Sequence, residues 1–555
     1  MQESTVNQKS ITGWCMYDWA NSSFFTSAAV AIAPIYFVQL FTNSLGNNVE
    51  ILGFNITSSS TWSFGVAFSA LIVAISTPFI GIIADRTRIK KKLLFYYTLI
   101  GSIVTCAAFF TNSFGSIAWI YLAICFIIGN AAAVGGTVFY NSILNHLVPK
   151  SMLDSISSRG YAIGYLGGGL LLLIHLIIIQ GLATLIDVDF LTRICLASVG
   201  VWWFGWSIWT FRTVPEPQIS NPINNFKIGY IFKLSINLLK ETLNEITLFK
   251  HVVWFLIAYL LFNDGIQTVL TIAGAYGADT LGLPLIINII TILLIQFVAA
   301  AGSMGFNYLA KKTSTKTSLT STLVGWIIVI TFAIGFAPLI PENHSEFDYQ
   351  FSFQSGNYII EKLPEIPDSM KELKTKYGNY ELLQKITKSD ASDVLKDITT
   401  NTKSDFSISI QGGPLDGKSG IGPLHPSRLE HDLVVWWPTL LRNILWDPLG
   451  ITIEIQWIIL GTCVGLVMGG SQALARSLFA YIIPEKRSTE FFSFFGFIGR
   501  TSAIIGPLLY AITVGFSTNR MAIFILVIII VIGTILLRKV NTEEARLFSE
   551  KILPN

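Results

Sequence analysis

Two acidic residues stand inside long apolar stretches of this sequence, where charged side chains are rare. Asp264 lies about a dozen residues into its stretch, which at 1.5 Å per residue places it near the middle of a membrane-spanning helix. A carboxylate at that depth is costly and is usually functional. Its chemistry suits it to carry a proton or to hold a substrate amine. The structural alternative is a cap on a kinked helix, since Gly265 follows.

The surroundings of both acids follow one pattern. Asp18 is followed by Asn21 and Asp264 by Gln267, and a hydroxyl residue comes next in each case. Positions i, i+3 and i+4 share one face of a helix, so each stretch presents an acid, an amide and a hydroxyl together. The amides suit contact with a substrate, and contact between helices is their alternative role. Asp18 lies nearer a helix end, where it serves either binding or a gate.

A basic residue near the end of a later apolar stretch complements these acids. Arg476 is expected about one turn from the inner end of its helix. Its guanidinium suits a substrate carboxylate or an acid of the helix bundle. The alternative is an arginine that extends toward the lipid headgroups.

A third group follows the second apolar stretch and has the composition of a gate. Asp85 suits hydrogen bonds from the amides at the start of the next helix and a pair with nearby cations. Gly81 permits close helix approach. We therefore predict a cytoplasmic gate formed by Gly81, Asp85, Arg86 and Lys90.

Other chemistry is not indicated. Gly412–Ser419 matches the phosphate-binding loop pattern, but Gly420, Gly422 and Pro423 follow where that loop needs a helix. His425 and His431 fit no metal-ligand spacing. His175, alone on an apolar stretch, is interpreted as a core histidine. We expect no cofactor, no metal and no catalytic group, and therefore no enzyme.

The composition identifies the elements that must position these residues. Of 555 residues, 52% are hydrophobic and 13% are charged, whereas soluble domains carry about 25% charged residues. The mean hydropathy is +0.59. These values exclude an ordinary soluble enzyme, a disordered chain and a coiled coil, and no basic tail or face indicates nucleic acid. Twelve stretches are long enough to span a bilayer as helices: 14–41, 61–83, 93–111, 116–140, 161–182, 191–212, 252–276, 283–309, 318–339, 451–474, 491–516 and 520–538.

Lys and Arg concentrate in alternate loops, which orients the chain with both termini in the cytoplasm. Residues 213–250 are then a cytoplasmic linker, with an amphipathic helix expected from Ile228 onward. Residues 341–450 are an external insertion, either a small domain or a loose loop. They contain a β-like run at Phe406–Ile410 and a helical stretch near 368–398.

The two halves of the chain resemble each other. Gly135-Gly-Thr137 aligns with Gly469-Gly-Ser471, in addition to the two acid–amide–hydroxyl patterns. Repeated halves with matching polar positions are typical of transporters that bind substrate between the halves. The predicted fold is therefore an all-α membrane protein with twelve helices in two six-helix halves, 1–212 and 251–340 with 451–555.

These features resemble the major facilitator superfamily, through Gly81–Lys91 after the second helix, and more narrowly its vacuole-effluxer, autophagy-related branch and bacterial relatives. The narrower resemblance covers nearly all of the chain outside 341–450. It rests on Tyr17–Ser22, Phe139–Ser142, Gly164–Gly169, Asn263–Val269, Gly470–Phe479 and Glu490–Phe492. The resemblance implies export of small solutes, with amino acids leaving the fungal vacuole as the model role. One departure is Lys311-Lys312 where a second gate would carry an acid and a base.

The expected function is a secondary transporter that exports amino acids by alternating access, with protons as a candidate coupling ion. Asp18, Asn21, Asp264, Gln267 and Arg476 are the predicted substrate or coupling contacts. We expect a monomer in a lipid bilayer, with a bacterial inner membrane favoured over a vacuolar one. One alternative is a lipid or drug exporter. Another is a receptor or scaffold that acts through the external insertion.

Overall fold

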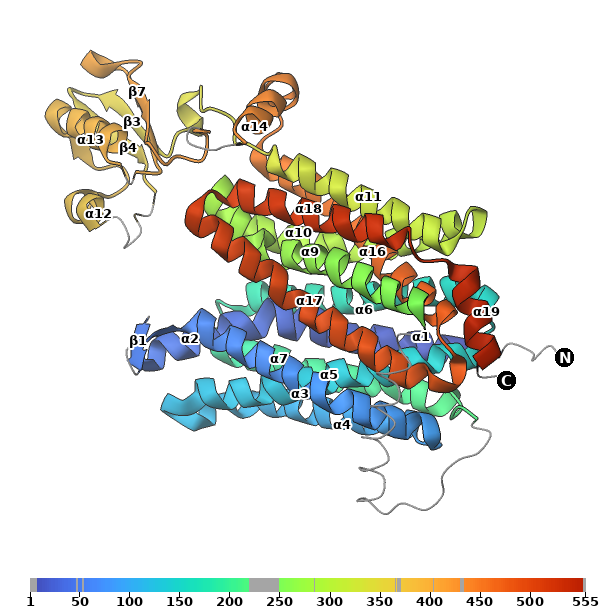
Figure 1. Cartoon of the computed structure of the whole chain (residues 1–555). Helices are drawn as coiled ribbons and strands as arrows, with labels where there is room; N and C mark the ends of the chain where they lie inside the picture. Colours follow the sequence, from blue (N-terminus) through green and yellow to red (C-terminus); the bar gives the residue numbers. More distant parts are fainter. Residues whose placement is uncertain are drawn as a thin grey trace.

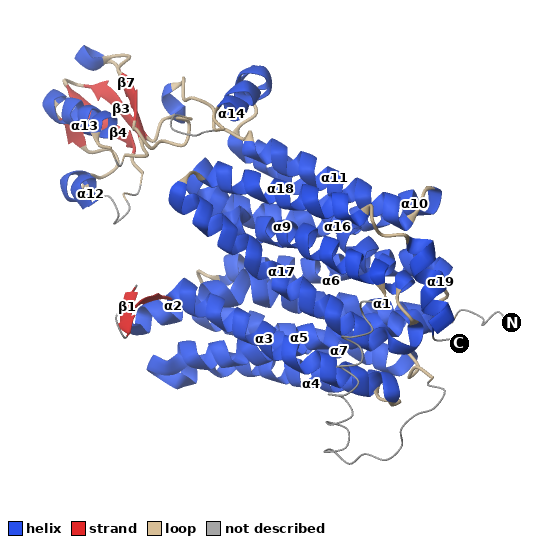
Figure 2. Ribbon diagram, viewed as in Figure 1, coloured by secondary structure: helices blue, strands red, loops and turns tan. Residues whose placement is uncertain are grey.

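The computed structural model describes residues 7–552 except 46–47, 52–53, 219–248, 284, 365, 367–370, 403 and 430–433. The expected amphipathic helix at 228–240 lies outside the described residues. Most of the rest is helix, with one small α/β unit (Figure 2).

The first half of the chain forms one group of helices. They are α1 (Gln8–Ser23), continued by η1 (Phe24–Ile32) and α2 (Ala33–Leu45), then α3 (Ser58–Arg86), α4 (Lys90–Ala107), α5 (Ala118–Leu147), α6 (Leu153–Leu182) and α7 (Val188–Thr213). A two-stranded hairpin, β1 (Asn48–Ile51) with β2 (Phe54–Thr57), precedes α3. The π-helical segment η1 interrupts the regular hydrogen bonding of the first helix, a feature that often marks functional sites.

The second half forms a matching group. It contains α9 (Lys250–Leu281), α10 (Leu285–Lys312), α11 (Thr315–Ile334), α16 (Ile453–Ile482), α17 (Ser488–Phe516) and α18 (Asn519–Leu537). The two groups pack against each other mainly through α3 and α5 on α17, and through α6 on α10 and α16. Figure 1 shows the blue and cyan helices of the first half on one side and the green to red helices of the second half on the other.

Nine helical stretches of the described residues are long and apolar enough to cross a membrane. One of them, Lys90–Leu147, contains both α4 and α5, and α3 and α17 contribute shorter apolar stretches, Phe64–Val73 and Ile505–Val514. Large apolar side chains remain exposed on the outer helix faces, for example on Ile103, Val201 and Ile528. An apolar outer surface is what a lipid environment requires.

The segment between α11 and α16 carries a folded α/β unit. Its five strands stand in the order β5-β4-β3-β6-β7, and β3 and β6 run parallel at the centre. The strands are β3 (Tyr349–Gln354), β4 (Asn357–Lys362), β5 (Lys385–Ile386), β6 (Ser407–Gln411) and β7 (Ser419–Ile421), with helices α12 (Lys371–Tyr377) and α13 (Lys388–Thr400). The predicted β run at Phe406–Ile410 is thus part of a strand, whereas the predicted helix near 368–398 is two helices with β5 between them.

The phosphate-loop pattern lies in the hairpin between β6 and β7. Gly412, Gly413 and Gly417 have φ of 78°, 67° and 69°, which favours glycine at all three positions. A strand follows the loop rather than a helix, so its structure is that of a turn, as the sequence predicts.

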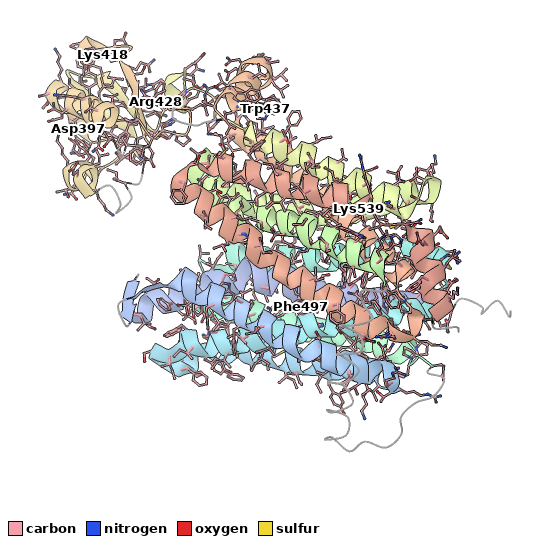
Figure 3. The ribbon with its side chains drawn as sticks, in the orientation of Figure 1. Asp397, Lys418, Arg428, Trp437, Phe497 and Lys539 are labelled. Carbon is pink, nitrogen blue, oxygen red and sulfur yellow. The ribbon has the colours of Figure 1, made fainter. Side chains whose placement is uncertain are left out.

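The α/β unit and the C-terminal helix lie at opposite ends of the helix bundle (Figure 1). The start of α1 and the helix α19 (Thr542–Ile552) lie at one end, here named the α19 end. At the opposite end, a short helix α14 (Trp436–Leu441) leads from the unit back toward α16. Figure 3 shows Asp397, Lys418 and Arg428 on the unit and Trp437 at this junction.

Candidate functional site

Arg476 and Asp18 meet at the interface between the two halves. Nη1 of Arg476, on α16, donates to Oδ2 of Asp18, on α1, at 3.2 Å, and the two side chains are 2% and 13% exposed. The hydroxyl of Tyr140 on α5 donates to the same oxygen at 2.6 Å. Arg476 therefore pairs with an acid of the bundle, which is one of the two roles predicted for it.

The other nitrogens of Arg476 also donate hydrogen bonds to residues of the first half. Nε donates to Ser157 Oγ at 2.9 Å and Nη2 to the Ser157 carbonyl at 2.7 Å, while Nη1 reaches Asn141 Oδ1 at 3.3 Å. Gly160 lies under this group, since a Cβ there would stand 2.6 Å from Asp18 Oδ2 and 3.0 Å from Arg476 Nη2. The arrangement fixes the guanidinium as a bridge between α16 and three helices of the other half.

Asp264 occupies a different environment, inside the second half. It is 1% exposed, and its Oδ1 accepts from the backbone amide of Gly506 on α17 at 2.8 Å. Pro507 follows inside the same helix, and a Cβ on Gly506 would lie 2.0 Å from Thr268 Oγ1. Its Oδ2 is buried with no hydrogen-bond partner among the described residues. Among the described residues, Asp264 therefore has no cationic partner like the one that Asp18 has.

The structure assigns contacts to the two predicted amide side chains less clearly than to the acids. Asn21 is 3% exposed, and its Oδ1 is buried without a hydrogen-bond partner among the described residues. Gln267 is half-buried on α9. Neither is brought to the Asp18–Arg476 pair by a hydrogen bond of the described residues.

The predicted gate residues do form a contact between the halves, but with a different helix from the one expected. Asp85 accepts from the backbone amides of Thr489, at 3.2 Å, and Glu490, at 2.8 Å, in the first turn of α17. The expectation that Asp85 bonds to the amides of the next helix, α4, is wrong: it bonds to amides of α17 instead. Those amides can bond to Asp85 because the residue at the N-cap of α17 provides no side-chain cap. A carboxylate at this position accepts hydrogen bonds from those amides and interacts favourably with the positive end of the helix dipole.

Lys90 and Gly81 complete this contact. Lys90 Nζ lies 2.6 Å from Asp85 Oδ1 and donates to Ser488 Oγ at 3.2 Å. A Cβ on Gly81 would stand 2.5 Å from Ser493 Oγ, so glycine lets α17 approach α3. Arg86 is exposed, which places it outside the contact.

A histidine that the sequence analysis did not identify joins the same cluster. His146 on α5 lies 2.9 Å from Lys90 through Nε2 and 3.1 Å from Glu485 Oε1 through Nδ1. Since the Lys90 ammonium has no lone pair, Nε2 accepts and Nδ1 carries the proton. In the sequence, a lone histidine near a helix end does not indicate which distant residues it contacts.

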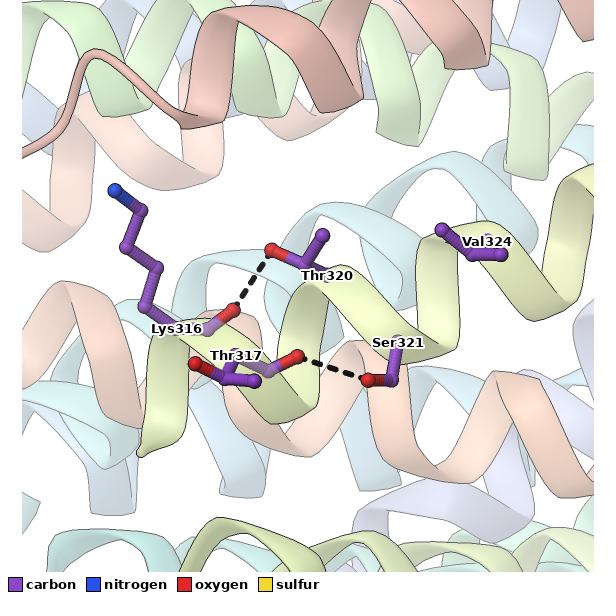
Figure 4. A pocket seen from close by; sticks show the side chains of 5 residues that line it. All are labelled: Lys316, Thr317, Thr320, Ser321 and Val324. Atoms are coloured by element: carbon purple, nitrogen blue, oxygen red, sulfur yellow. Dashed lines mark hydrogen bonds between the residues drawn. The ribbon is translucent and has the colours of Figure 1, made fainter. Parts of the chain in front are cut away.

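A second contact between the halves has its charges arranged differently. Asp154, in the first turn of α6, accepts from Ser477 Oγ at 2.6 Å and from Thr315 Oγ1. Lys311 and Lys312 are exposed. Lys316 instead donates to the carbonyls of Arg538 and Val540 at the end of α18, at 3.0 and 2.8 Å. It also lines a surface pocket on α11 with Thr317, Thr320, Ser321 and Val324 (Figure 4).

These contacts gather toward the α19 end of the bundle. Further bonds between the halves there join Asn145 to the Ala480 carbonyl at 2.9 Å and Ser157 to the Ala473 carbonyl at 2.7 Å. His175 lies elsewhere, within the first half, where its ring nitrogens bond to Ser27 and Ser198.

Comparison with known proteins identifies the family. The model of the family described as "Vacuole effluxer Atg22 like" matches residues 6–345 and 432–548. The chain belongs to the Atg22-like vacuole effluxer family. The unmatched gap between the two stretches, 346–431, contains the α/β unit.

Two curated relatives span nearly the same length. An uncharacterized MFS-type transporter, YxiO, of Bacillus subtilis (strain 168) is 24% identical over 97% of this chain and 96% of its own length. Autophagy-related protein 22 of Candida glabrata is 21% identical, over 98% and 91% of the two chains.

Solved structures give the fold. The MFS proton:xylose symporter XylE matches with a TM-score of 0.56 at 12% identity, over 98% of both chains. A bacterial homologue of the iron transporter ferroportin in an outward-facing state matches with a TM-score of 0.52 at 12% identity, over 96% and 98%. The Atg22-like protein thus has the major facilitator fold and is an integral, multi-pass membrane transporter of the MFS type, as the sequence predicts.

Proposed function

We propose that this Atg22-like protein exports amino acids by alternating access between its two halves. The observation that carries the proposal is the Asp18–Arg476 pair. It joins opposite charges from the two halves, at 3.2 Å, in a buried position. Transport by alternating access requires the interface that holds this pair to open.

When the interface opens, an acidic and a basic side chain that suit an amino acid become available. When α16 separates from α1, the carboxylate of Asp18 and the guanidinium of Arg476 both lose their partner. Leaving one buried charge uncompensated typically costs about 3–5 kcal/mol. An amino acid replaces both partners at once, because it offers a cationic group to Asp18 and its carboxylate to Arg476.

The distribution of contacts supports the same cycle. The bonds of Asp85, Lys90, Arg476 and Asp154 close the two halves together toward the α19 end. The loops at that end carry most of the Lys and Arg, so we assign it to the cytoplasm of a bacterial cell. The α/β unit then lies outside.

Asp264 is the proposed coupling residue. A carboxylate is costly to bury without a partner. Asp264 accepts one amide bond and has no ion pair among the described residues, so its carboxyl group is suited to take up and release a proton. Proton binding here, distinct from substrate binding at Asp18, allows a proton gradient to drive the cycle.

A binding panel tests the proposal. The purified protein in detergent is mixed with amino acids, sugars, nucleosides and lipids, and the melting temperature is followed with concentration, since a ligand of the folded state raises it by mass action. We expect a rise with amino acids that is lost in Asp18→Asn and kept in Arg86→Gln, which alters an exposed residue beside the gate. A rise with lipids alone would contradict the proposal.

A further inference from the structure

Among the described residues, every hydrogen-bond partner and every aromatic ring against the guanidinium of Arg476 belongs to the other half of the molecule. Trp14 and Asp18 come from α1, Tyr140 and Asn141 from α5, and Ser157 and Tyr161 from α6. Arg476 itself comes from α16 and is 2% exposed. The first half therefore contains a site for a planar cation, and the second half fills it with one of its own side chains.

Three aromatic rings form the walls of this pocket. The guanidinium carbon of Arg476 lies 4.1 Å from the ring centre of Tyr161, 4.9 Å from that of Trp14 and 5.6 Å from that of Tyr140. Each distance lies within the range of a cation–π contact, about 6 Å. Trp14 and Tyr140 are stacked on each other with centroids 4.3 Å apart, and Trp14 Nε1 donates to the Tyr140 carbonyl at 3.0 Å, so these walls are held in place without Arg476.

The polar atoms of the pocket accept bonds in the directions in which a guanidinium donates them. Acceptors at Ser157 meet Nε and Nη2, and acceptors at Asp18 and Asn141 meet Nη1. A guanidinium has five donors in a fixed plane and accepts none, whereas an ammonium group is a compact point charge. The pocket matches the planar group more closely.

We propose that this pocket binds the cationic side chain of the transported solute, and that the preferred substrates are amino acids with a guanidinium side chain. This inference rests on the proposed amino-acid export and specifies its substrate class. Arg476 acts as a tethered occupant that the substrate replaces. When the halves part, Asp18 stays with the aromatic walls on the first half and requires a new cation.

The released Arg476 gives the second half a complementary role. Its guanidinium then binds the carboxylate of the substrate, because paired N–H groups match a carboxylate well. A substrate with a cation at one end and a carboxylate at the other thus contacts both halves. Since substrate and Arg476 compete for the same pocket, the closed contact toward the α19 end and the loaded site exclude each other.

The pocket can be tested directly by removing its occupant. In Arg476→Ala, methylguanidinium at millimolar concentration should raise the melting temperature with increasing dose. Methylurea, which has nearly the same shape without the charge, should not. Arg476→Ala combined with Asp18→Asn should lose the response. Arg520→Ala is the matched control, because Arg520 is also buried, at 6% exposure, but lies on α18 away from this pocket.

Equal responses to methylguanidinium and methylurea, or the same response in Arg520→Ala, would overturn the pocket. The wild-type protein provides a second test that does not depend on folding of the variants. Its affinity for L-arginine should exceed that for L-leucine at least tenfold. If leucine binds as well as or better than arginine, the cationic preference is wrong and amino-acid export stands. If no amino acid binds, both proposals fail.

Discussion

Arg476 and Asp18 form an ion pair although they stand 458 positions apart in the chain. The pair lies where α16 of the second half meets α1 of the first, and both side chains are largely removed from solvent, at 2% and 13% exposure. When the halves separate, each of these two residues loses the other as its ion-pair partner. The proposed transport cycle therefore links the stability of the protein to transport at this contact.

The first prediction concerns the energy of this pair. Arg476→Ala and Asp18→Asn should each destabilise the protein by about 3–5 kcal/mol, because each leaves one buried charge without its partner. The double variant should lose less than the sum of the two, since it leaves no unpaired charge. Chemical denaturation of the detergent-solubilised protein measures the three changes. Additive losses would show that the two residues do not interact.

The second prediction concerns the gate. Asp85→Asn removes the charge that pairs with Lys90 at 2.6 Å and that caps the first turn of α17. The α19 end should then open more often, so an engineered cysteine in the contact should react with a water-soluble maleimide at least several times faster. Arg86→Gln is the control, because Arg86 is adjacent and exposed. Equal labelling rates in both variants would contradict a latch at Asp85.

The third prediction separates coupling from binding at Asp264. Asp264→Asn keeps the shape of the side chain, and its amide oxygen still accepts from Gly506, but it cannot release a proton. Exchange of labelled for unlabelled substrate across proteoliposomes should persist in this variant. Accumulation driven by an imposed pH gradient should be lost. If the gradient still drives accumulation, Asp264 is not the coupling residue.

The fourth prediction concerns acid stability of the α/β unit. Burial by itself raises the pKa of Asp348. Hydrogen bonds from His425 and Ser407 lower the pKa by more than burial raises it, so the pKa lies below its ordinary value of about 4. A depressed carboxyl pKa contributes stability above the unfolded pKa, and this is lost as pH falls through the folded value. Hydrogen-exchange protection of β6 amides should therefore fall below about pH 4. The fall should be smaller in Asp348→Asn and unchanged in Asp393→Asn, an exposed carboxylate of α13.

The fifth prediction tests the role of the inserted unit. Residues 343–433 can be replaced by a short Gly–Ser linker, because the flanking segments are held together without them. Trp437 Nε1 donates to the Thr331 carbonyl at 2.7 Å and Trp446 Nε1 to the Gly335 carbonyl at 3.1 Å. Transport should survive this deletion. Loss of all function in a folded deletion variant, with Asp264→Asn and Arg476→Ala active, would favour the receptor or scaffold alternative.

Hydropathy predicted the location of the helices but not all of their ends. The apolar stretches 116–140 and 451–474 correspond to α5, which ends at Leu147, and α16, which ends at Ile482. The extra turns contain His146 and Arg476, which lower hydropathy while continuing the helical hydrogen bonds. His146 and Arg476 therefore lie in the part of each helix that an apolar pattern omits.

The sequence indicated the chemical role of single residues better than it indicated which residues they contact. The type and position of Asp85 indicated a carboxylate that caps a helix, but local reasoning pointed to α4, whereas α17 lies about 400 positions later. Trp14 and Tyr161 gave no polar signal inside their apolar stretches, and Ser157 lies before the stretch that begins at residue 161. In the α/β unit, the helical pattern near 368–398 concealed a break at Leu383, which has a φ of 65°. The backbone amide of Leu383 donates to the Ile360 carbonyl on β4 at 2.8 Å, a long-range hydrogen bond that accompanies a conformation leucine rarely adopts.

Transport of labelled amino acid into proteoliposomes of the reconstituted protein tests the central claim most directly. The account predicts uptake in exchange for internal unlabelled amino acid by the wild-type protein, with arginine preferred, and a loss of at least tenfold in both Asp18→Asn and Arg476→Ala. Uptake that is equal in the wild type and in both variants, or exchange that no amino acid supports, would contradict it.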